Sequence, residues 1–221
     1  MAILQRVCRT YLKLGERHLA GRAMISQALF TGFDGHPEEA IGLLERGMAL
    51  LDPDREPILP LKAIHNQALF LIDAERYREA RILLWQSHAL YQRFGEPLVE
   101  VRRRWLEGRI YTGLREFAKA ETTLRRVQGD LLSQGQVYDA ALASLDLIRL
   151  GVLAGDREQL PGWVDEVLAV FREHQVSWAA VGYLKTFRER CLDRTLSADS
   201  LCAMLKLVAS VVDDLDDEGH G

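Results

Sequence analysis

The chain has 221 residues, of which 48% are hydrophobic and 27% are charged, and its 28 Lys and Arg against 32 Asp and Glu leave a formal net charge of −4. This composition is typical of a globular protein, and it excludes a strongly basic nucleic-acid-binding protein and a disordered chain that is poor in apolar residues. No stretch approaches the roughly 18 consecutive apolar residues of a membrane-spanning helix, so we expect no membrane segment.

Apolar residues recur at spacings of three and four along nearly the whole chain, which predicts an all-α fold of about eleven helices. We place these helices at residues 2–14, 17–33, 37–51, 58–73, 77–94, 97–113, 117–134, 137–153, 157–173, 177–192 and 198–213. The six prolines lie where a helix could begin or has just ended. We expect left-handed backbone at five glycines near helix C-termini, which are Gly15, Gly35, Gly95, Gly135 and Gly155.

The sequence repeats at a spacing of 40 residues. The segment Gln27-Ala28-Leu29-Phe30 recurs as Gln67-Ala68-Leu69-Phe70. A third copy follows, in which Gly108 and Ala120 correspond to Ala68 and Ala80. Repetition at this length predicts an array of helical hairpins, because no hairpin can bury its apolar face alone and each must pack on its neighbours.

In each repeat a small residue is followed twelve positions later by a second one, and two repeats carry an aromatic residue three positions before the second. The small pairs are Ala28 and Ala40, Ala68 and Ala80, and Gly108 and Ala120, the aromatic residues are Tyr77 and Phe117, and Pro37 replaces the aromatic residue in the first repeat. This pattern resembles the tetratricopeptide repeat, in a long-period form similar to the repeats of bacterial transcription regulators. The resemblance implies a right-handed superhelical solenoid of antiparallel helix pairs. HEAT and armadillo arrays, with periods of roughly 40–47 residues, are the alternative, although they lack this pair of small residues.

The repeat predicts a single helical domain over residues 1–213 and an acidic, disordered tail at 214–221. The expected repeats lie near residues 21–60, 61–100, 101–140, 141–176 and 177–213. Residues 2–14 align with the second helix of a repeat, so we expect them either to cap the array or to be part of a longer regulatory protein.

No sequence motif for catalysis or metal binding occurs. The chain contains no HExxH, GxGxxG, GxxxxGK[ST] or GxSxG motif, so we expect no metal, no cofactor and no enzymatic activity. Cys8 and Cys191 lie in helical apolar patterns, where a buried, unreactive thiol is expected. Together with Cys202 they form no CxxC pair, which favours a reducing, cytoplasmic environment.

The resemblance implies that the first helix of each repeat lines a concave groove and points its second, fifth and ninth positions into it. The candidate peptide-binding residues at these positions are Arg22, Lys62, His65, Arg102, Trp105, Arg109 and Arg149. Guanidinium groups bind carboxylates bidentately and an indole can anchor a partner, so these residues favour an extended ligand with acidic groups. The alternative is an ordinary solvated basic face, with Trp105 in a packing role.

These features predict a protein–protein interaction scaffold that binds a peptide or protein segment in its groove, as the sensing or docking region of a bacterial regulatory protein. The alternative is an all-helical enzyme or small-ligand carrier with a site between hairpins. We expect no direct nucleic-acid binding, because Arg102, Arg103 and Arg104 point about 100° apart on a helix and cannot all face one phosphate backbone. The seventh positions of the repeats, Gln27, Gln67 and Glu107, predict polar contacts between successive hairpins.

Overall fold

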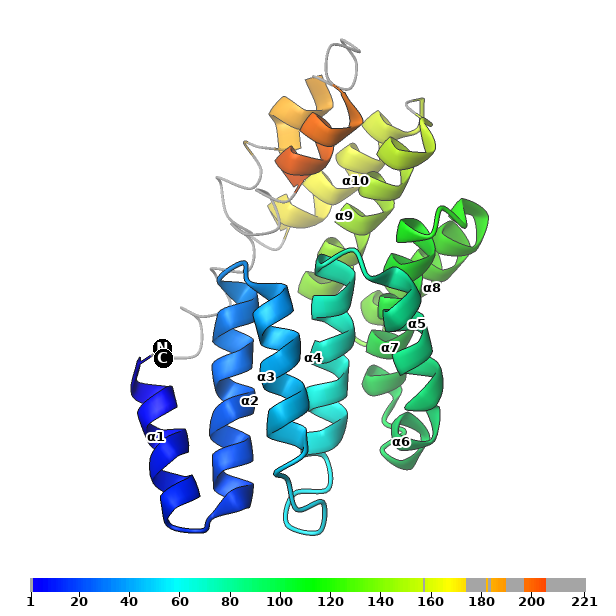
Figure 1. Ribbon diagram of the computed structural model, residues 1–221. Coiled ribbons are helices and arrows are strands. Elements are labelled where there is room, and N and C mark those ends of the chain that lie inside the picture. The colour runs from blue at the N-terminus through cyan, green and yellow to red at the C-terminus, as the bar shows by residue number, and fades with distance from the viewer. Residues whose placement is uncertain (1, 157, 174–181, 183, 190–196, 206–221) are drawn as a thin grey trace. The chain divides into compact units, whose positions relative to one another are not determined.

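The structure is a computed structural model that describes residues 2–156, 158–173, 182, 184–189 and 197–205, and every regular element within these ranges is an α-helix (Figure 1). The helices are α1 (Ala2–Lys13), α2 (Arg17–Phe33), α3 (Pro37–Met48), α4 (Leu59–Asp73), α5 (Tyr77–Gln86), α6 (His88–Arg93), α7 (Pro97–Gly113), α8 (Phe117–Ser133), α9 (Val137–Ala154) and α10 (Leu160–Glu173). Residues 184–189 and 198–205 are helical as well. The predicted all-α fold is therefore confirmed. The acidic tail at 214–221, Cys191 and most of the repeat expected at 177–213 lie outside the described residues.

The prediction of a single helix over residues 77–94 is wrong, because the structure has two helices there, α5 and α6. The division falls at Ser87, whose hydroxyl donates hydrogen bonds to the carbonyl oxygens of Leu83 (2.7 Å) and Leu84 (3.3 Å). A serine hydroxyl that bonds to the preceding turn competes with the backbone hydrogen bonds of a helix and often bends it. The break therefore falls at a residue that bonds to the preceding turn.

The chain forms two compact units, residues 1–106 and 107–221. In the N-terminal unit, α2 packs between α1 and α3, α3 also contacts α4, and α4 contacts α5. Figure 1 shows α1 to α4 side by side in this order. In the C-terminal unit, α9 packs between α8 and α10, and its apolar side chains share a core with those of α10 and of the helical residues 184–189 and 198–205.

The small residues behind the repeat pattern lie where helices approach each other. Five of them, all alanines, have no exposed surface: Ala28, Ala40, Ala68, Ala80 and Ala120. A Cβ atom on Gly108 would lie 2.6 Å from Cδ2 of Leu124, so α7 and α8 touch at this point. A Cβ atom on Gly21 would lie 2.7 Å from the carbonyl oxygen of Gly47, so α2 and α3 are equally close. A side chain larger than alanine at the alanine positions, or any side chain at the two glycines, would separate these helices.

The 40-residue repeat is also present in the backbone. Left-handed residues end the first helix of four successive hairpins, and they are Gly35 (φ 88°), Glu75 (φ 60°), Arg115 (φ 60°) and Gly155 (φ 77°). After each of them, the next backbone N–H donates to the carbonyl oxygen five residues earlier, as in a Schellman motif. The expected left-handed glycines are confirmed at 15, 35, 135 and 155, whereas the expectation for Gly95 is wrong. Sequence inspection missed Glu75 and Arg115, because neither is a glycine.

Changing Glu75 or Arg115 to glycine should stabilise the protein. Both side chains are exposed, and a left-handed residue with a Cβ atom is strained, which outweighs the extra freedom that a glycine gives the unfolded chain. We expect each variant to raise the free energy of unfolding by about 0.5–1 kcal/mol in urea denaturation. Gly35→Ala is the reverse control and should lower it by about 1 kcal/mol. A loss of stability in both glycine variants would contradict this explanation of the turns.

Across the described part of the chain, none of the helices combines the length and the apolar composition that crossing a lipid bilayer requires.

Candidate functional site

The predicted groove residues lie on the first helices of the hairpins. Arg22 lies on α2, Lys62 and His65 lie on α4, Arg102, Trp105 and Arg109 lie on α7, and Arg149 lies on α9. The first five belong to the N-terminal unit, and Arg109 and Arg149 belong to the C-terminal unit. The predicted groove residues are therefore divided between the two units.

The second positions of three successive repeats carry exposed cations in the N-terminal unit. Arg22, Lys62 and Arg102 are all exposed. Arg22 pairs with Glu56 at 2.9 Å, so part of its charge is already balanced. Lys62 forms no ion pair or side-chain hydrogen bond with any described residue. A carboxylate from outside the chain could thus approach Lys62 without displacing an internal partner.

His65 and the arginines beside Arg102 are held by internal contacts. Nδ1 of His65 lies 3.2 Å from the hydroxyl of the buried Tyr91 on α6, so this contact orients the imidazole toward the interior. Arg103 donates two hydrogen bonds to Glu100, at 2.7 and 2.8 Å, and these hold the pKa of the Glu100 carboxyl below its usual range. Arg104 lies 3.7 Å from the same carboxylate. Of the three consecutive arginines, only Arg102 is exposed, as expected for side chains that point about 100° apart.

In the C-terminal unit, Arg109 lies near an acid that the sequence analysis did not identify as its partner. Its Nε atom lies 3.8 Å from a carboxylate oxygen of Asp146 on α9, and both side chains are mostly buried. Arg149 lies one helical turn beyond Asp146, also partly buried. An acidic ligand would therefore have to compete with Asp146 for Arg109. Helical periodicity alone could not reveal this pair, because its members come from different repeats.

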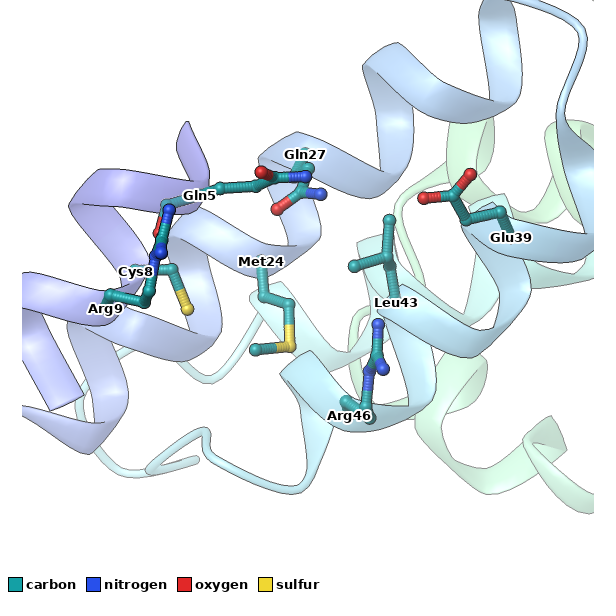
Figure 2. Close-up of a pocket in the computed structure, with 8 residues that line it drawn as sticks. All are labelled: Gln5, Cys8, Arg9, Met24, Gln27, Glu39, Leu43 and Arg46. Carbon is teal, nitrogen blue, oxygen red and sulfur yellow. The ribbon is translucent and has the colours of Figure 1, made fainter. Parts of the chain in front are cut away.

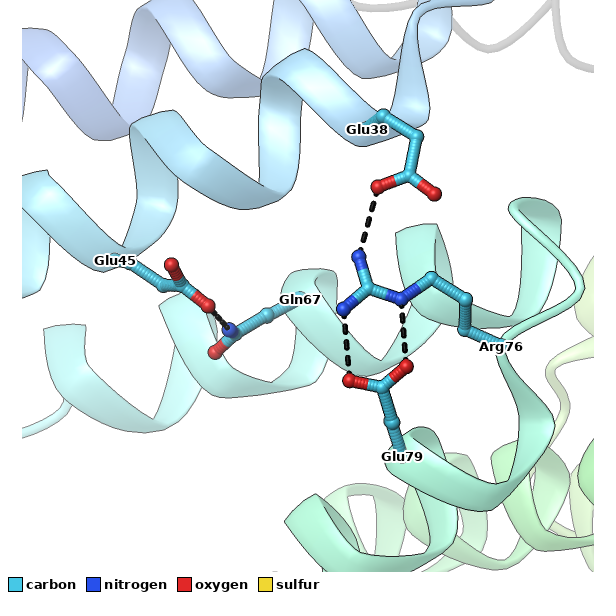
Figure 3. A network of polar contacts seen from close by, with 5 residues as sticks. All are labelled: Glu38, Glu45, Gln67, Arg76 and Glu79. Carbon is cyan, nitrogen blue, oxygen red and sulfur yellow. Dashed lines mark hydrogen bonds and ion pairs between the residues drawn. The ribbon is translucent and has the colours of Figure 1, made fainter.

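The polar contact predicted between successive hairpins is present at Gln67. Its Nε2 atom donates a hydrogen bond to Oε1 of Glu45 on α3, at 3.1 Å (Figure 3). Gln67 and its counterpart Gln27 are both buried, as expected for these positions. Glu107, the third member, is partly buried.

A second polar contact joins the same hairpins. Arg76 donates one hydrogen bond to Glu38 at 2.7 Å and two to Glu79 at 2.7 and 2.8 Å (Figure 3). The hydrogen bonds to Glu79 are the main cause of a raised pKa of Arg76, so the guanidinium stays charged. Glu38 lies on α3 and Glu79 on α5, so Arg76 connects the two hairpins.

The structure contains a pocket that the sequence did not predict. It is an open cavity of about 350 Å³ between α1, α2 and α3 (Figure 2). Its lining residues are Gln5, Cys8, Arg9, Met24, Gln27, Glu39, Leu43 and Arg46. Its volume lies within the roughly 300–1,000 Å³ range of small-molecule sites. Cys8 is buried and not in a disulfide, and it forms part of the apolar lining.

Among the described residues, no group of three or more His, Cys, Asp or Glu side chains is arranged to hold a metal ion. Several charged side chains instead form ion pairs with one another, as Arg22 does with Glu56 and Arg76 with Glu38. The described surface therefore offers binding groups for acids, and its geometry suggests no set of metal ligands.

No protein-family model matches the sequence, and no curated protein matches it. The assignment of a family and a function to this chain therefore depends on its residues and their geometry.

Proposed function

We propose that the chain is a protein–protein interaction module, a right-handed solenoid of tetratricopeptide-like helix pairs that binds an acidic protein segment along the first helices of its repeats. The observation that carries this proposal is the recurrence of an exposed cation every 40 residues, at Arg22, Lys62 and Arg102. The buried small residues and the left-handed turns share the same period, which supports the equivalence of these positions. We further propose that the module serves a bacterial regulatory protein as its sensing or docking region.

The strength of such a surface follows from its charges. Each exposed ion pair contributes about 0.2–1 kcal/mol, so a partner needs several pairs along its length. Equal spacing of cations along the sequence suits an extended segment, because successive acidic side chains can each meet one repeat. Binding should weaken as salt is added, since exposed charges are screened.

A capped polyglutamate peptide with a fluorescent label is a suitable probe, with binding measured by fluorescence anisotropy. The double variant Lys62→Gln, Arg102→Gln should bind about fivefold more weakly than the natural chain, because it loses two exposed pairs. Lys13→Gln, Arg78→Gln is the matched control: it removes the same charge from exposed positions outside this set and should change the affinity less than twofold. Equal losses in the two double variants would show that the peptide responds only to net charge, which would contradict the proposal.

A further inference from the structure

The pocket between α1, α2 and α3 combines an apolar lining with charged residues at its rim. Cys8, Met24 and Leu43 provide buried or partly buried apolar surface. Arg9 and Arg46 are exposed at the rim (Figure 2). Arg9 donates one hydrogen bond from Nε to the backbone carbonyl of Gln5, at 3.3 Å, which leaves its terminal nitrogens available.

Gln27 is a buried amide that lines this pocket. Its side chain lines the cavity and the residue is only 5% exposed. Within the described part of the chain, its side-chain amide forms no hydrogen bond, not even with Gln5, which lines the same cavity. No nitrogen or oxygen of the Gln27 side chain is both fully buried and unpaired among the described residues, so its amide reaches the open cavity. The amide can therefore donate a hydrogen bond to a group that enters the cavity.

The next repeat shows which kind of group binds an amide at this position. Gln67 lies 40 residues after Gln27, and its amide donates to the carboxylate of Glu45 at 3.1 Å. The residue 40 positions before Glu45 is Gln5, so the first repeat has an amide where the second has a carboxylate. In the second repeat the chain supplies the carboxylate itself, whereas the first repeat lacks it.

The pocket in the first repeat also carries two positive charges that the second repeat lacks. Arg9 and Arg46 of the pocket correspond to Ala49 and Gln86 in the second repeat. The first repeat therefore loses one anion and gains two cations around an equivalent buried amide. Glu39 at the rim does not account for this difference, because its counterpart is also a glutamate. The combination of a missing anion and added cations favours an anion from outside the chain.

We propose that this pocket binds the carboxylate group of a ligand with a short apolar chain. The carboxylate accepts a hydrogen bond from the Gln27 amide, as Glu45 does from Gln67, and Arg9 and Arg46 balance its charge. The apolar chain lies against Cys8, Met24 and Leu43. This site is separate from the proposed peptide surface, because none of its lining residues is among the groove positions. This carboxylate belongs either to a free aliphatic acid or to a glutamate of a protein segment, and the test distinguishes these two sources.

The test uses the whole chain and two pairs of probes, with binding measured by calorimetry and by backbone amide shifts. Hexanoate is compared with hexanamide, which has the same shape and no charge. A short capped peptide with one glutamate is compared with its glutamine version. Two variants give the first repeat the residue that the second repeat has at the equivalent position. Gln5→Glu introduces the carboxylate of Glu45, and Arg46→Gln introduces the neutral side chain of Gln86. Arg55→Gln, another exposed arginine, is the control, and thermal unfolding verifies that each variant is folded.

We expect hexanoate or the glutamate peptide to bind with shifts at Cys8, Gln27 and Leu43, and the neutral probes not to bind. Binding should weaken at least tenfold in Gln5→Glu and in Arg46→Gln and stay unchanged in Arg55→Gln. Binding of hexanoate assigns the site to a free acid, and binding of the peptide alone assigns it to a protein segment. The proposal is overturned if neither acid binds, if neutral and charged probes bind equally, or if Gln5→Glu binds as the natural chain does. Lys62→Gln, Arg102→Gln should leave this binding intact, so the failure of one proposal does not imply the failure of the other.

Discussion

Phe70→Ala should lower the free energy of unfolding by about 3–5 kcal/mol, one of the largest losses expected for a single side chain of this protein. Phe70 on α4 has no exposed surface and lies in the core of the N-terminal unit. A Cβ atom on Gly32 of α2 would lie 2.2 Å from its ring, so the two helices close tightly around it. Removal of the ring leaves a cavity between α2 and α4 that their backbones cannot fill. Urea denaturation followed by circular dichroism measures the loss.

Phe33→Ala is the matched control for this substitution. Phe33 meets the ring of Phe70 edge-on, with centroids 5.6 Å apart, but it is 70% exposed. Its removal deletes the same aromatic contact without opening a buried cavity, so we expect a loss of about 1 kcal/mol. Similar losses in the two variants would show that Phe70 is not at the centre of a tightly packed core.

Gly21→Ala should lower the free energy of unfolding by about 1–3 kcal/mol, although alanine is the better helix former. The new Cβ atom would lie 2.7 Å from the carbonyl oxygen of Gly47, which is backbone and cannot rotate away. The contact would therefore force α2 and α3 apart. Thermal and urea unfolding of the variant test this expectation.

Gly42→Ala provides the comparison within the same pair of helices. Gly42 lies inside α3, and a Cβ atom there would meet no atom within 4 Å. We expect this variant to raise the free energy of unfolding by about 0.5–1 kcal/mol, because alanine favours the helix and nothing opposes it. If Gly21→Ala were stabilising as well, the close approach of α2 and α3 would be disproved.

Much of the helical architecture could be predicted from the sequence, because it depends on local signals. The bounds of α2 and α7 were predicted to the residue. Proline at the first position of α3 and α7 marks where these helices begin, since its missing N–H has no partner there in any helix. The repeat of small residues could be read from the sequence, and in the structure Ala28, Ala68 and Gly108 are all buried.

The features that escaped prediction depend on particular atoms or on distant contacts. The break at Ser87 has no clear sequence signal, because Ser144 makes the same bond to the preceding turn inside the unbroken helix α9. Glu75 and Arg115 are not residue types that favour a left-handed backbone. Their positions, 40 residues after Gly35 and 40 before Gly155, could have predicted this conformation.

The candidate site was predictable only in outline. Its exposed cations could be located from the repeat, but the acids that pair with Arg22 and Arg109 come from other segments of the chain. The pocket escaped prediction because it arises where the repeats differ, and the repeat pattern shows only what they share. The differences at Gln5 and Arg9 carried the signal, and these are visible in the aligned repeats.

The most direct test of the proposed peptide surface is a backbone amide NMR titration of the Gln5→Glu variant with the capped polyglutamate peptide. In this variant the introduced glutamate is expected to occupy the carboxylate pocket, so the chemical shift changes report on peptide binding at the groove positions alone. We expect the largest shifts around Arg22, Lys62 and Arg102, on α2, α4 and α7, and we expect them to diminish as salt is added. Shifts spread evenly over the exposed arginines and lysines, or concentrated on the second helices α3, α5 and α8, would contradict the proposed surface.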